Sequence, residues 1–403
     1  MRVRSLLSLV AFACCASFAG AADRITLKDG TVLEGRIVYD TPGNLVILQG
    51  SKERELRADE ATDVRSVERS LKLVLARWEQ APETNAVARL EIAKVARAFE
   101  LEGEARIFAL GALVADPSLE AAHVFLGHEK KAGVWNVREE KKLFPFHEFD
   151  RVHAVWRDAS RLSTLHFTLR TNMPLAQAIA AALELELVYR AFFDRFRMEL
   201  SLRDVVAPMA AQIHADRLSY PGGANRSGFF DTQLNTFFQD ASEGYQPRTT
   251  AHEVTHQLLY NTASKTKAAL GSIPAWIDEG LADTIGMSRT GAPGHARYDP
   301  AARAQFYFQI HANAKKPYDL SRVLALGTED FIVSSHVDYA YAQAYTLVYY
   351  CLNGAEQKYR AGFFEYLRRC YAGKSSMTEF RDALAIKEPV FEAEWHAYAR
   401  KAP

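Results

Sequence analysis

The segment TTAHEVTHQLLYN, residues 249–261, carries two histidines four positions apart and a glutamate directly after the first. If the threonines at its start cap a helix, His252 and His256 project from one face of it, where both imidazoles can reach one ion. Glu253 is rotated by about 100° from His252 and therefore lies beside that ion. Paired histidines on a helix are also commonly solvated or packed in a core. The helix alone leaves both interpretations open, and a third ligand decides between them.

A third ligand is available in the segment IPAWIDEGLADTIGM. Pro274 marks the start of a second helix, and Glu279 on that helix follows His256 after 22 intervening residues. Two neutral imidazoles and one carboxylate suit zinc and leave its fourth position open for water. Gly280 is expected to let this helix pack closely against the first. Asp283, one turn later, can accept a hydrogen bond from a ligand histidine and fix its tautomer.

The pattern H-E-x-x-H followed by W-x-x-E-G-x-A-D resembles the gluzincin branch of zinc metallopeptidases, the thermolysin-like and peptidase MA-like group. The resemblance implies zinc as the cofactor, with ligands at His252, His256 and Glu279. It also implies that Glu253 is the catalytic glutamate and that Asp283 is the aspartate that bonds to a ligand histidine. The chain is most similar to uncharacterised, secreted bacterial members that carry helical repeats in front of the peptidase domain.

The upstream segment GGANRSGFFDTQLNTFFQDA is similar to the hairpin of this family whose edge strand lies along bound substrate. The hairpin lacks the G-A-M-E-N motif of the aminopeptidase branch. No paired acids are evident that would hold the free amine of a substrate. The resemblance therefore favours an endopeptidase over an exopeptidase.

A tyrosine is the candidate donor to the oxyanion of the tetrahedral intermediate. Aminopeptidase-type gluzincins carry a catalytic tyrosine in the setting Y-x-x-G/A-x-x-x-x-x-x-L, which resembles the segment DYAYAQAYTLVYYCLNG and implies Tyr341. Tyrosines at helical spacing usually serve packing, and this segment holds several. Tyr339 and His336 are the alternative donors.

Changes in residue pattern divide the chain into a multidomain α+β protein. Residues 23–68 alternate apolar and polar positions between turn signals, which predicts four or five short strands in a small SH3-like β-barrel. Residues 69–148 have apolar positions three or four apart, which predicts a short tetratricopeptide-like (TPR-like) helical segment. A hairpin closes that segment, with Trp135 packed as a plug. Residues 149–403 form the gluzincin-like domain, with an upstream mixed sheet and a helical half.

Within the last domain, STLHFTLRTN predicts one strand, and PLAQAIAAALELELVYRAFFDRF predicts a long amphipathic helix. VVAPMAAQIHADRLSY predicts another strand, and the segments SGFF and NTFFQDA predict a hairpin around residues 231–235. His123 and His128 are expected to be structural, and His214 and His311 to be packed or hydrogen-bonded. The histidines without ligand spacing are His147, His153, His166, His295 and His396. Cys351 and Cys370 fall on two helices whose antiparallel packing offsets them by roughly 20 Å. A disulfide needs Cα atoms within about 7 Å, so two buried free thiols are predicted.

The first residues, MRVRSLLSLVAFACCASFAGAAD, predict a secretory signal over residues 1–22. Its apolar run is shorter than the ~20 residues of a membrane anchor, and Ala11-Phe12 is a poor match for lipidation at Cys14. The mature protein is expected to be secreted, periplasmic or in the cell envelope, without a transmembrane segment. Acidic and basic residues are equal at 49 each, which disfavours nucleic acid as a partner.

The sequence therefore predicts a secreted zinc metalloprotease, a hydrolase that acts on peptide or protein substrates. Glu253 takes a proton from a zinc-activated water and passes it to the leaving nitrogen. The barrel and the helical segment are candidate docking surfaces for an envelope protein. The alternative is a non-catalytic metallopeptidase-fold scaffold or binding protein of the cell envelope. A Ser-His-Asp hydrolase is disfavoured because the chain lacks a G-x-S-x-G elbow.

Overall fold

The computed structural model describes residues 22–140, 142–223, 226–263, 273–288, 300–332 and 336–401. The predicted secretory signal lies outside this part of the chain, apart from residue 22. The described residues form a mixed α+β structure of several sheets and helices with a separate sheet at the N-terminus, so the predicted fold class is confirmed. No helix in these ranges combines the length and the apolar character that a bilayer span requires.

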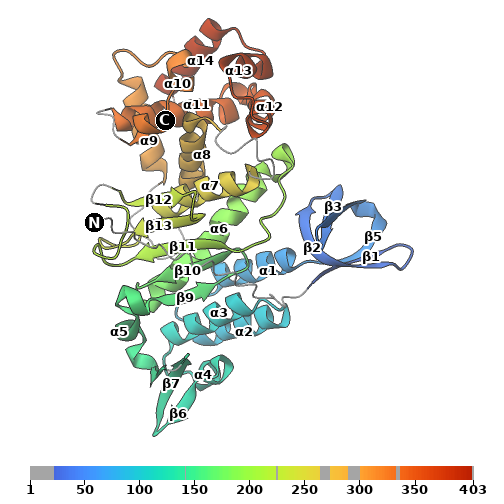
Figure 1. Ribbon diagram of the computed structural model, residues 1–403, viewed down its shortest axis with the longest axis vertical. Helices are drawn as coiled ribbons and strands as arrows, with labels where there is room; N and C mark the ends of the chain where they lie inside the picture. The colour runs from blue at the N-terminus through green and yellow to red at the C-terminus, as the bar shows by residue number, and fades with distance from the viewer. Residues whose placement is uncertain are drawn as a thin grey trace, which may run out of the picture.

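The N-terminal sheet is a unit that projects from the side of the molecule (Figure 1, blue). Its five antiparallel strands are β1 (Asp23–Leu27), β2 (Val32–Asp40), β3 (Asn44–Gln49), β4 (Lys52–Arg57) and β5 (Ala61–Arg65). They are paired in the order β4-β3-β2-β1-β5. Register shifts within β1 and β2 bend the strands, which lets the sheet curl around its own core of Ile25, Ile37 and Ile47. The short strands predicted for this region are therefore present.

Four helices follow: α1 (Val67–Gln80), α2 (Ala86–Ala98), α3 (Glu102–Ala115) and α4 (Glu120–Leu126). The side chains of Ser66 and Asn85 cap α1 and α2 by accepting hydrogen bonds from backbone N–H groups. A meander then replaces the predicted hairpin, with strands β6 (Glu129–Lys131), β7 (Val134–Glu139) and β8 (Lys142–Pro145). Trp135 on β7 is only partly buried and stacks on His123, with ring centroids 4.7 Å apart. The ring therefore packs against α4, as predicted, although it is not fully buried.

A five-stranded sheet lies in the middle of the molecule, in the order β12-β13-β11-β10-β9 (Figure 1). Its strands are β9 (Ser160–Ser163), β10 (Phe167–Thr171), β11 (Met209–His214), β12 (Gly228–Asp231) and β13 (Thr236–Asp240). Strands β10, β11 and β13 are parallel, whereas the two outer strands run antiparallel to their neighbours. The hairpin predicted around residues 231–235 is confirmed, and it puts β12 at the edge of the sheet.

The strand predicted for STLHFTLRTN is present as β10, but it begins only at Phe167, because the chain turns between β9 and β10. The Thr164 amide donates to the Phe167 carbonyl at 2.8 Å, and the Thr164 hydroxyl accepts from the Phe167 amide at 3.2 Å. A threonine side chain thus offers the backbone a local turn in place of continued strand pairing. His166 in this turn is buried, and its Nδ1 lies 2.8 Å from Oε2 of Glu186.

Helix α6 (Leu175–Leu200) connects β10 to β11, as the sequence predicts, and α7 (Pro247–Ala263) follows β13. The short helix α5 (Phe149–His153) precedes the sheet. The helical half contains α8 (Ala275–Ser288), α9 (Pro300–Ala312), α10 (Leu320–Leu324), α11 (Val337–Asn353), α12 (Arg360–Tyr371), α13 (Met377–Leu384) and α14 (Glu388–Lys401). Helix α7 packs against β12 and β13, and α8 packs against both α7 and α11. The helical half lies at the end of the molecule opposite to the β6–β8 meander (Figure 1).

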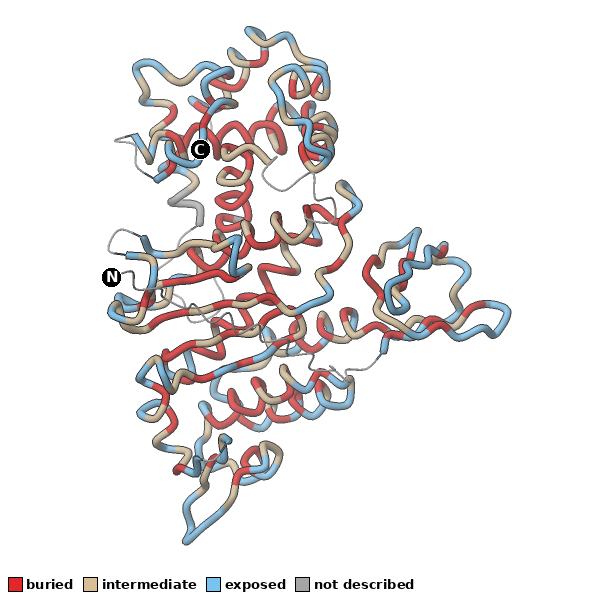
Figure 2. The backbone as a smooth tube through the Cα atoms, viewed as in Figure 1, coloured by how far each residue is buried: buried red, intermediate tan, exposed pale blue. Residues whose placement is uncertain are grey.

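One hydrophobic core runs through the helical segment, the central sheet and the helical half (Figure 2). It extends from Leu71 of α1 through Leu169 of β10 to Trp395 of α14. Helix α3 approaches the sheet so closely that a Cβ on Gly103 would lie 2.1 Å from the carbonyl oxygen of Ser163. Residues 69–148 therefore share their core with the central sheet and the helical half, and they support the sheet directly.

The two cysteines that follow the predicted signal both lie in helices. Cys351 of α11 and Cys370 of α12 are buried free thiols, as the sequence predicts. Burial raises the pKa of the Cys370 thiol to about 12, so this group is protonated and unreactive at neutral pH.

Candidate metal centre

Helix α7 is fixed on the central sheet by polar contacts as well as by its apolar residues. The Thr250 hydroxyl donates to Oε1 of Gln239 on β13 at 2.7 Å, and Nε2 of Gln257 donates to two backbone carbonyls of the sheet region. The helix begins at Pro247, a residue type whose fixed φ suits the first helical position. The predicted threonine cap is therefore wrong, and Thr250 serves to attach the helix to the sheet.

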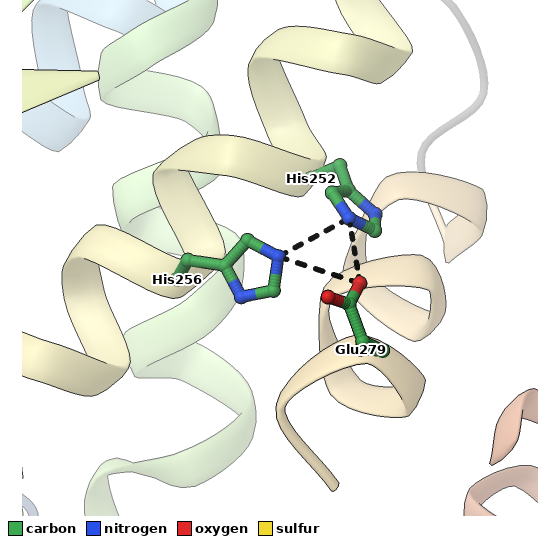
Figure 3. Close-up of side chains that lie close together, drawn as sticks. All are labelled: His252, His256 and Glu279. Carbon is green, nitrogen blue, oxygen red and sulfur yellow. Dashed lines mark hydrogen bonds and ion pairs between the residues drawn. The ribbon is translucent and has the colours of Figure 1, made fainter. Parts of the chain in front are cut away.

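His252 and His256 of α7 and Glu279 of α8 converge on one point (Figure 3). Nε2 of His252 lies 3.1 Å from Oε2 of Glu279 and 3.2 Å from Nε2 of His256. The third pair, Nε2 of His256 and Oε2 of Glu279, is 3.6 Å apart. The three side chains are 12%, 11% and 15% exposed, respectively. The three residues that the sequence singles out as ligands are thus brought together in a nearly closed site.

The outer nitrogen of each imidazole is held by a carboxylate of α8. Nδ1 of His252 lies 3.2 Å from Oδ1 of Asp283, and Nδ1 of His256 lies 2.8 Å from Oδ1 of Asp278. A neutral imidazole that donates its Nδ1–H to a carboxylate keeps a lone pair on Nε2. The two Nε2 atoms lie 3.2 Å apart, so either a shared proton or a cation between them can satisfy both.

The spacing of the three ligand atoms fits a tetrahedral zinc site. Zinc bonds imidazole nitrogen and carboxylate oxygen at about 2.0–2.2 Å, which separates neighbouring ligand atoms of a tetrahedron by roughly 3.3–3.5 Å. The observed separations of 3.1, 3.2 and 3.6 Å bracket that range. Two nitrogens and one oxygen also leave a fourth position for water or substrate. The residues present therefore fit a zinc ion with one open coordination position.

The electrostatics of the site favour positive charge. Burial alone would lower the pKa of His252, but the hydrogen bonds with Asp283 and Glu279 outweigh it and raise that pKa to about 9. Burial is also outweighed at Glu279, whose pKa lies well below its usual range because His256 and His252 face it. In the metal-free protein, protons on the histidines balance the charge of the carboxylates. A divalent cation that binds there displaces these protons.

Glu253 lies on the side of α7 that faces β12, next to the ligand histidines. It is buried, and a Cβ on Gly228 at the start of β12 would lie 3.0 Å from its Cγ and 3.2 Å from its Oε1. Burial raises the pKa of the Glu253 carboxyl, although the charges of His252 and His256 oppose the shift. No hydrogen bond to this carboxylate comes from the described part of the chain. The group is therefore available to exchange a proton.

Tyr341 of α11 reaches the same site. Its ring centroid lies 6.2 Å from that of His252. Burial raises the pKa of Tyr341, so the hydroxyl keeps its proton and can donate a hydrogen bond. Tyr339 instead donates to the carbonyl of Lys316 at 3.0 Å, and His336 stands at the N-cap position of α11. Of the tyrosine pair, only Tyr341 lies against a ligand histidine.

Gly280 serves a different contact from the one that the sequence predicts. A Cβ there would lie 2.6 Å from Cγ2 of Val348 and 2.9 Å from the carbonyl oxygen of Ala344. Both residues belong to α11, so this glycine lets α8 approach α11 and not α7. The prediction is wrong because a residue next to Glu279 is rotated by about 100° away from the ligand face. Gly286 is the glycine of α8 that faces α7.

Asp278 and Arg248 belong to the site but are not revealed by the motif. Asp278 directly precedes Glu279, and only the packing of α8 on α7 shows that it faces a ligand histidine. Arg248 lies one turn before His252 and donates to Oδ1 of Asp283 at 2.9 Å. Its positive charge helps to keep that carboxylate ionised. The spacing of four residues between Arg248 and His252 is a signal from which this contact could have been predicted.

Four histidines that the sequence predicts to be structural, packed or hydrogen-bonded contact other side chains, namely His123, His128, His214 and His311. His123 and His128 contact each other through their Nδ1 atoms at 2.7 Å, and Nε2 of His311 lies 2.8 Å from Nδ1 of His396. His295 lies outside the described residues. Over the described ranges, the only group of three metal-binding side chains with ligand atoms within 4.8 Å of one another is the trio on α7 and α8.

Comparison with known proteins concerns the same part of the chain. The model of a family described as "Protein of unknown function (DUF1570)" matches residues 247–374. This DUF1570 domain begins with α7, ends just after α12 and contains the trio of potential ligands. The N-terminal sheet, the helical segment and the central sheet lie before the match. No curated protein matches the chain.

Proposed function

We propose that the protein is a zinc-dependent metallopeptidase of the gluzincin type, which hydrolyses internal peptide bonds of a peptide or protein substrate outside the cytoplasm. One observation carries the proposal: two Nε2 atoms face each other, both Nδ1 atoms are held by carboxylates, and Glu279 completes the triangle. The packed pairs His123–His128 and His311–His396 also bring ring nitrogens together, but among the described residues only the trio adds a carboxylate oxygen to them, and an acid holds the outer nitrogen of each of its imidazoles, as metal sites require. Export is proposed from the N-terminal residue pattern alone.

The residues around the trio fit the chemistry of peptide hydrolysis. His252, His256 and Glu279 would hold the zinc ion, which would supply a Lewis acid for the scissile carbonyl and lower the pKa of water to about 7. Glu253 accepts the proton of the attacking water and transfers it to the leaving nitrogen. The raised pKa of Glu253 suits both steps, because the group must take a proton and then release it. Tyr341 donates a hydrogen bond to the developing oxyanion.

The edge strand β12 supports the binding of an extended substrate. It pairs with β13 on one side, and its first residue, Gly228, lies against Glu253. A peptide that adds to the other side as a further strand is held by main-chain hydrogen bonds and needs no contact through its termini. This mode of binding favours cleavage of internal bonds.

Cleavage of casein or of a quenched-peptide library by the purified, zinc-loaded chain tests the proposal. We expect cleavage that stops when a chelator removes the metal and returns when zinc is restored. Glu253→Gln should keep its zinc but lose about 10²–10⁴-fold of kcat, the usual contribution of a general base. Wild-type turnover by this variant would refute the role of Glu253.

A zinc-binding but non-catalytic scaffold of the cell envelope is the second candidate function. The observation in its favour is the N-terminal sheet, which has a core of its own and projects from the side of the molecule (Figure 1). Such a unit is suited to docking a partner protein. Stoichiometric zinc without cleavage of any library peptide would support this function over the first.

A further inference from the structure

An aromatic pair joins α7, the helix of the two candidate ligand histidines, to the edge strand β12. Tyr260 of α7 and Phe230 of β12 meet edge-on, with ring centroids 5.5 Å apart. Both side chains are partly exposed, although phenylalanine is among the residue types that are most often fully buried. Partly exposed rings beside a reactive centre offer apolar contact area to a ligand.

The spacing on α7 puts Tyr260 in line with the reacting groups. His256 and Tyr260 are four residues apart, and Glu253 and Tyr260 are seven apart, so all three lie along one side of the helix. The rise of 1.5 Å per residue puts Tyr260 about 6 Å beyond His256 along the helix axis. That distance is close to the advance of two residues in an extended peptide.

The alternation of residues along β12 also places two of its positions towards α7. Gly228 and Phe230 are two residues apart and face the same side of the sheet, towards α7. Gly228 lies against Glu253, and Phe230 lies against Tyr260. Helix α7 and strand β12 therefore run side by side, with the proton-exchanging carboxylate at one point and the aromatic pair at the next.

The amide side chains near this pair are already bonded. Asn235 and Asn261 join the β12–β13 turn to α7 through two hydrogen bonds, each 2.9 Å between nitrogen and oxygen. These bonds hold the hairpin and the helix in a fixed relation, so the two rings keep their places. A side chain that enters beside them meets carbon surface that is already in position.

We propose that Phe230 and Tyr260 form an apolar subsite, which receives an aromatic or large aliphatic side chain of the substrate within two residues of the cleaved bond. The proposal rests on the peptidase function proposed above. A peptide added to the edge of β12 alternates its side chains between the two faces of the sheet. Those on the face of Gly228 and Phe230 point towards α7, and the one next to Phe230 contacts the aromatic pair. A well-fitting apolar side chain there should raise kcat/KM by about 10-fold or more over a polar one.

The experiment uses the zinc-loaded full chain and has two readouts. Mass spectrometry of the cleaved peptide library gives the residue preference at each position within two residues of the cut. Calorimetry measures the binding of two probes that chelate zinc, the hydroxamates of N-acetyl-phenylalanine and N-acetyl-aspartate. We expect an apolar preference at one position and about 10-fold tighter binding of the phenylalanine probe. The apolar preference and the tighter binding of the phenylalanine probe should be lost in Tyr260→Ser and kept in Tyr260→Phe.

Phe125→Ser is the matched control, because Phe125 is a partly buried ring on α4, far from α7 in the chain. Equal binding of the two probes by wild type, or an unchanged preference in Tyr260→Ser, overturns the subsite. Binding of both probes without any peptide cleavage overturns the peptidase function, and the ratio of the two affinities still decides whether the subsite exists. If Tyr260→Ser loses its zinc, Phe230→Ala replaces it as the test variant in both readouts, because that substitution leaves α7 unaltered.

Discussion

Replacing Gly228 by alanine tests whether Glu253 must occupy the narrow space beside β12. A Cβ at this position would lie 2.6 Å from Cγ2 of Thr249 and 3.0 Å from Cγ of Glu253. Ordinary contacts between carbon atoms are about 3.5–4.0 Å. The strand and the helix must therefore separate by roughly 0.5–1 Å, or the glutamate must turn away.

The expected cost has two parts. Overpacking of this kind destabilises a fold by about 1–3 kcal/mol, which lowers the midpoint of thermal unfolding by several degrees. A misplacement of about 1 Å at a reacting group costs about 10²-fold in rate. Zinc content should not change, because the three atoms nearest to a Cβ at position 228 belong to Thr249 and Glu253 and not to a potential ligand. The predicted result for Gly228→Ala is a folded, zinc-loaded protein with kcat reduced about 100-fold.

The assay compares zinc stoichiometry, thermal midpoint and kcat on one quenched peptide for wild type, Gly228→Ala and Gly43→Ala. Gly43 is the matched control, because a Cβ on it meets nothing within 4 Å. Gly43→Ala should therefore resemble wild type in all three measurements. If Gly228→Ala kept both its zinc and its full kcat, the position assigned to Glu253 beside β12 would not matter for turnover.

Two further predictions concern the aspartates of the site, Asp278 and Asp283, and the buried histidine His311. Asp278→Asn and Asp283→Asn should each weaken zinc binding about 10–100-fold, measured by competition with a chelator of known affinity; unchanged affinity in both would contradict the bonds to Nδ1. Burial lowers the pKa of His311 to about 3, below the ~6.5 of an unfolded chain. The unfolded state therefore binds more protons in that window, and the free energy of unfolding should fall as the pH drops below 6.5, by up to about 1.4 kcal/mol per pH unit from this residue. Denaturant unfolding between pH 7 and 5 measures how the free energy of unfolding depends on pH. His311→Gln should give a shallower dependence than wild type, and an identical dependence would contradict the prediction.

The convergence of the trio could be predicted from the sequence because it depends on helix periodicity. Residues four apart on α7 share a face whatever the helix packs against, and a carboxylate on a following helix needs only that the two helices touch. Which side chains of α8 face α7 depends on how α8 is rotated about its axis, and the motif does not give that rotation. For this reason the role of Asp278 was not predicted and the contact of Gly280 was assigned to the wrong helix.

Competition between local hydrogen bonds and strand pairing explains why β10 is shorter than the predicted strand. Thr164 closes a turn inside a segment whose β-branched residues predict an unbroken strand, because a hydroxyl can satisfy the backbone in place of a neighbouring strand. The sequence patterns also did not reveal that the helical segment and the sheet share one hydrophobic core. It depends on the contact of Gly103 with Ser163, which joins residues far apart in the chain and leaves no periodic signal.

Metal analysis of the purified full chain shows directly whether the trio binds zinc. We predict one zinc per chain, held through the imidazole nitrogens of His252 and His256 and a carboxylate oxygen of Glu279. His256→Ala and Glu279→Ala should lose that zinc, whereas Phe125→Ser should keep it. A wild-type protein that binds no zinc at micromolar concentration, or variants of the trio that bind it as well as wild type, would contradict the account.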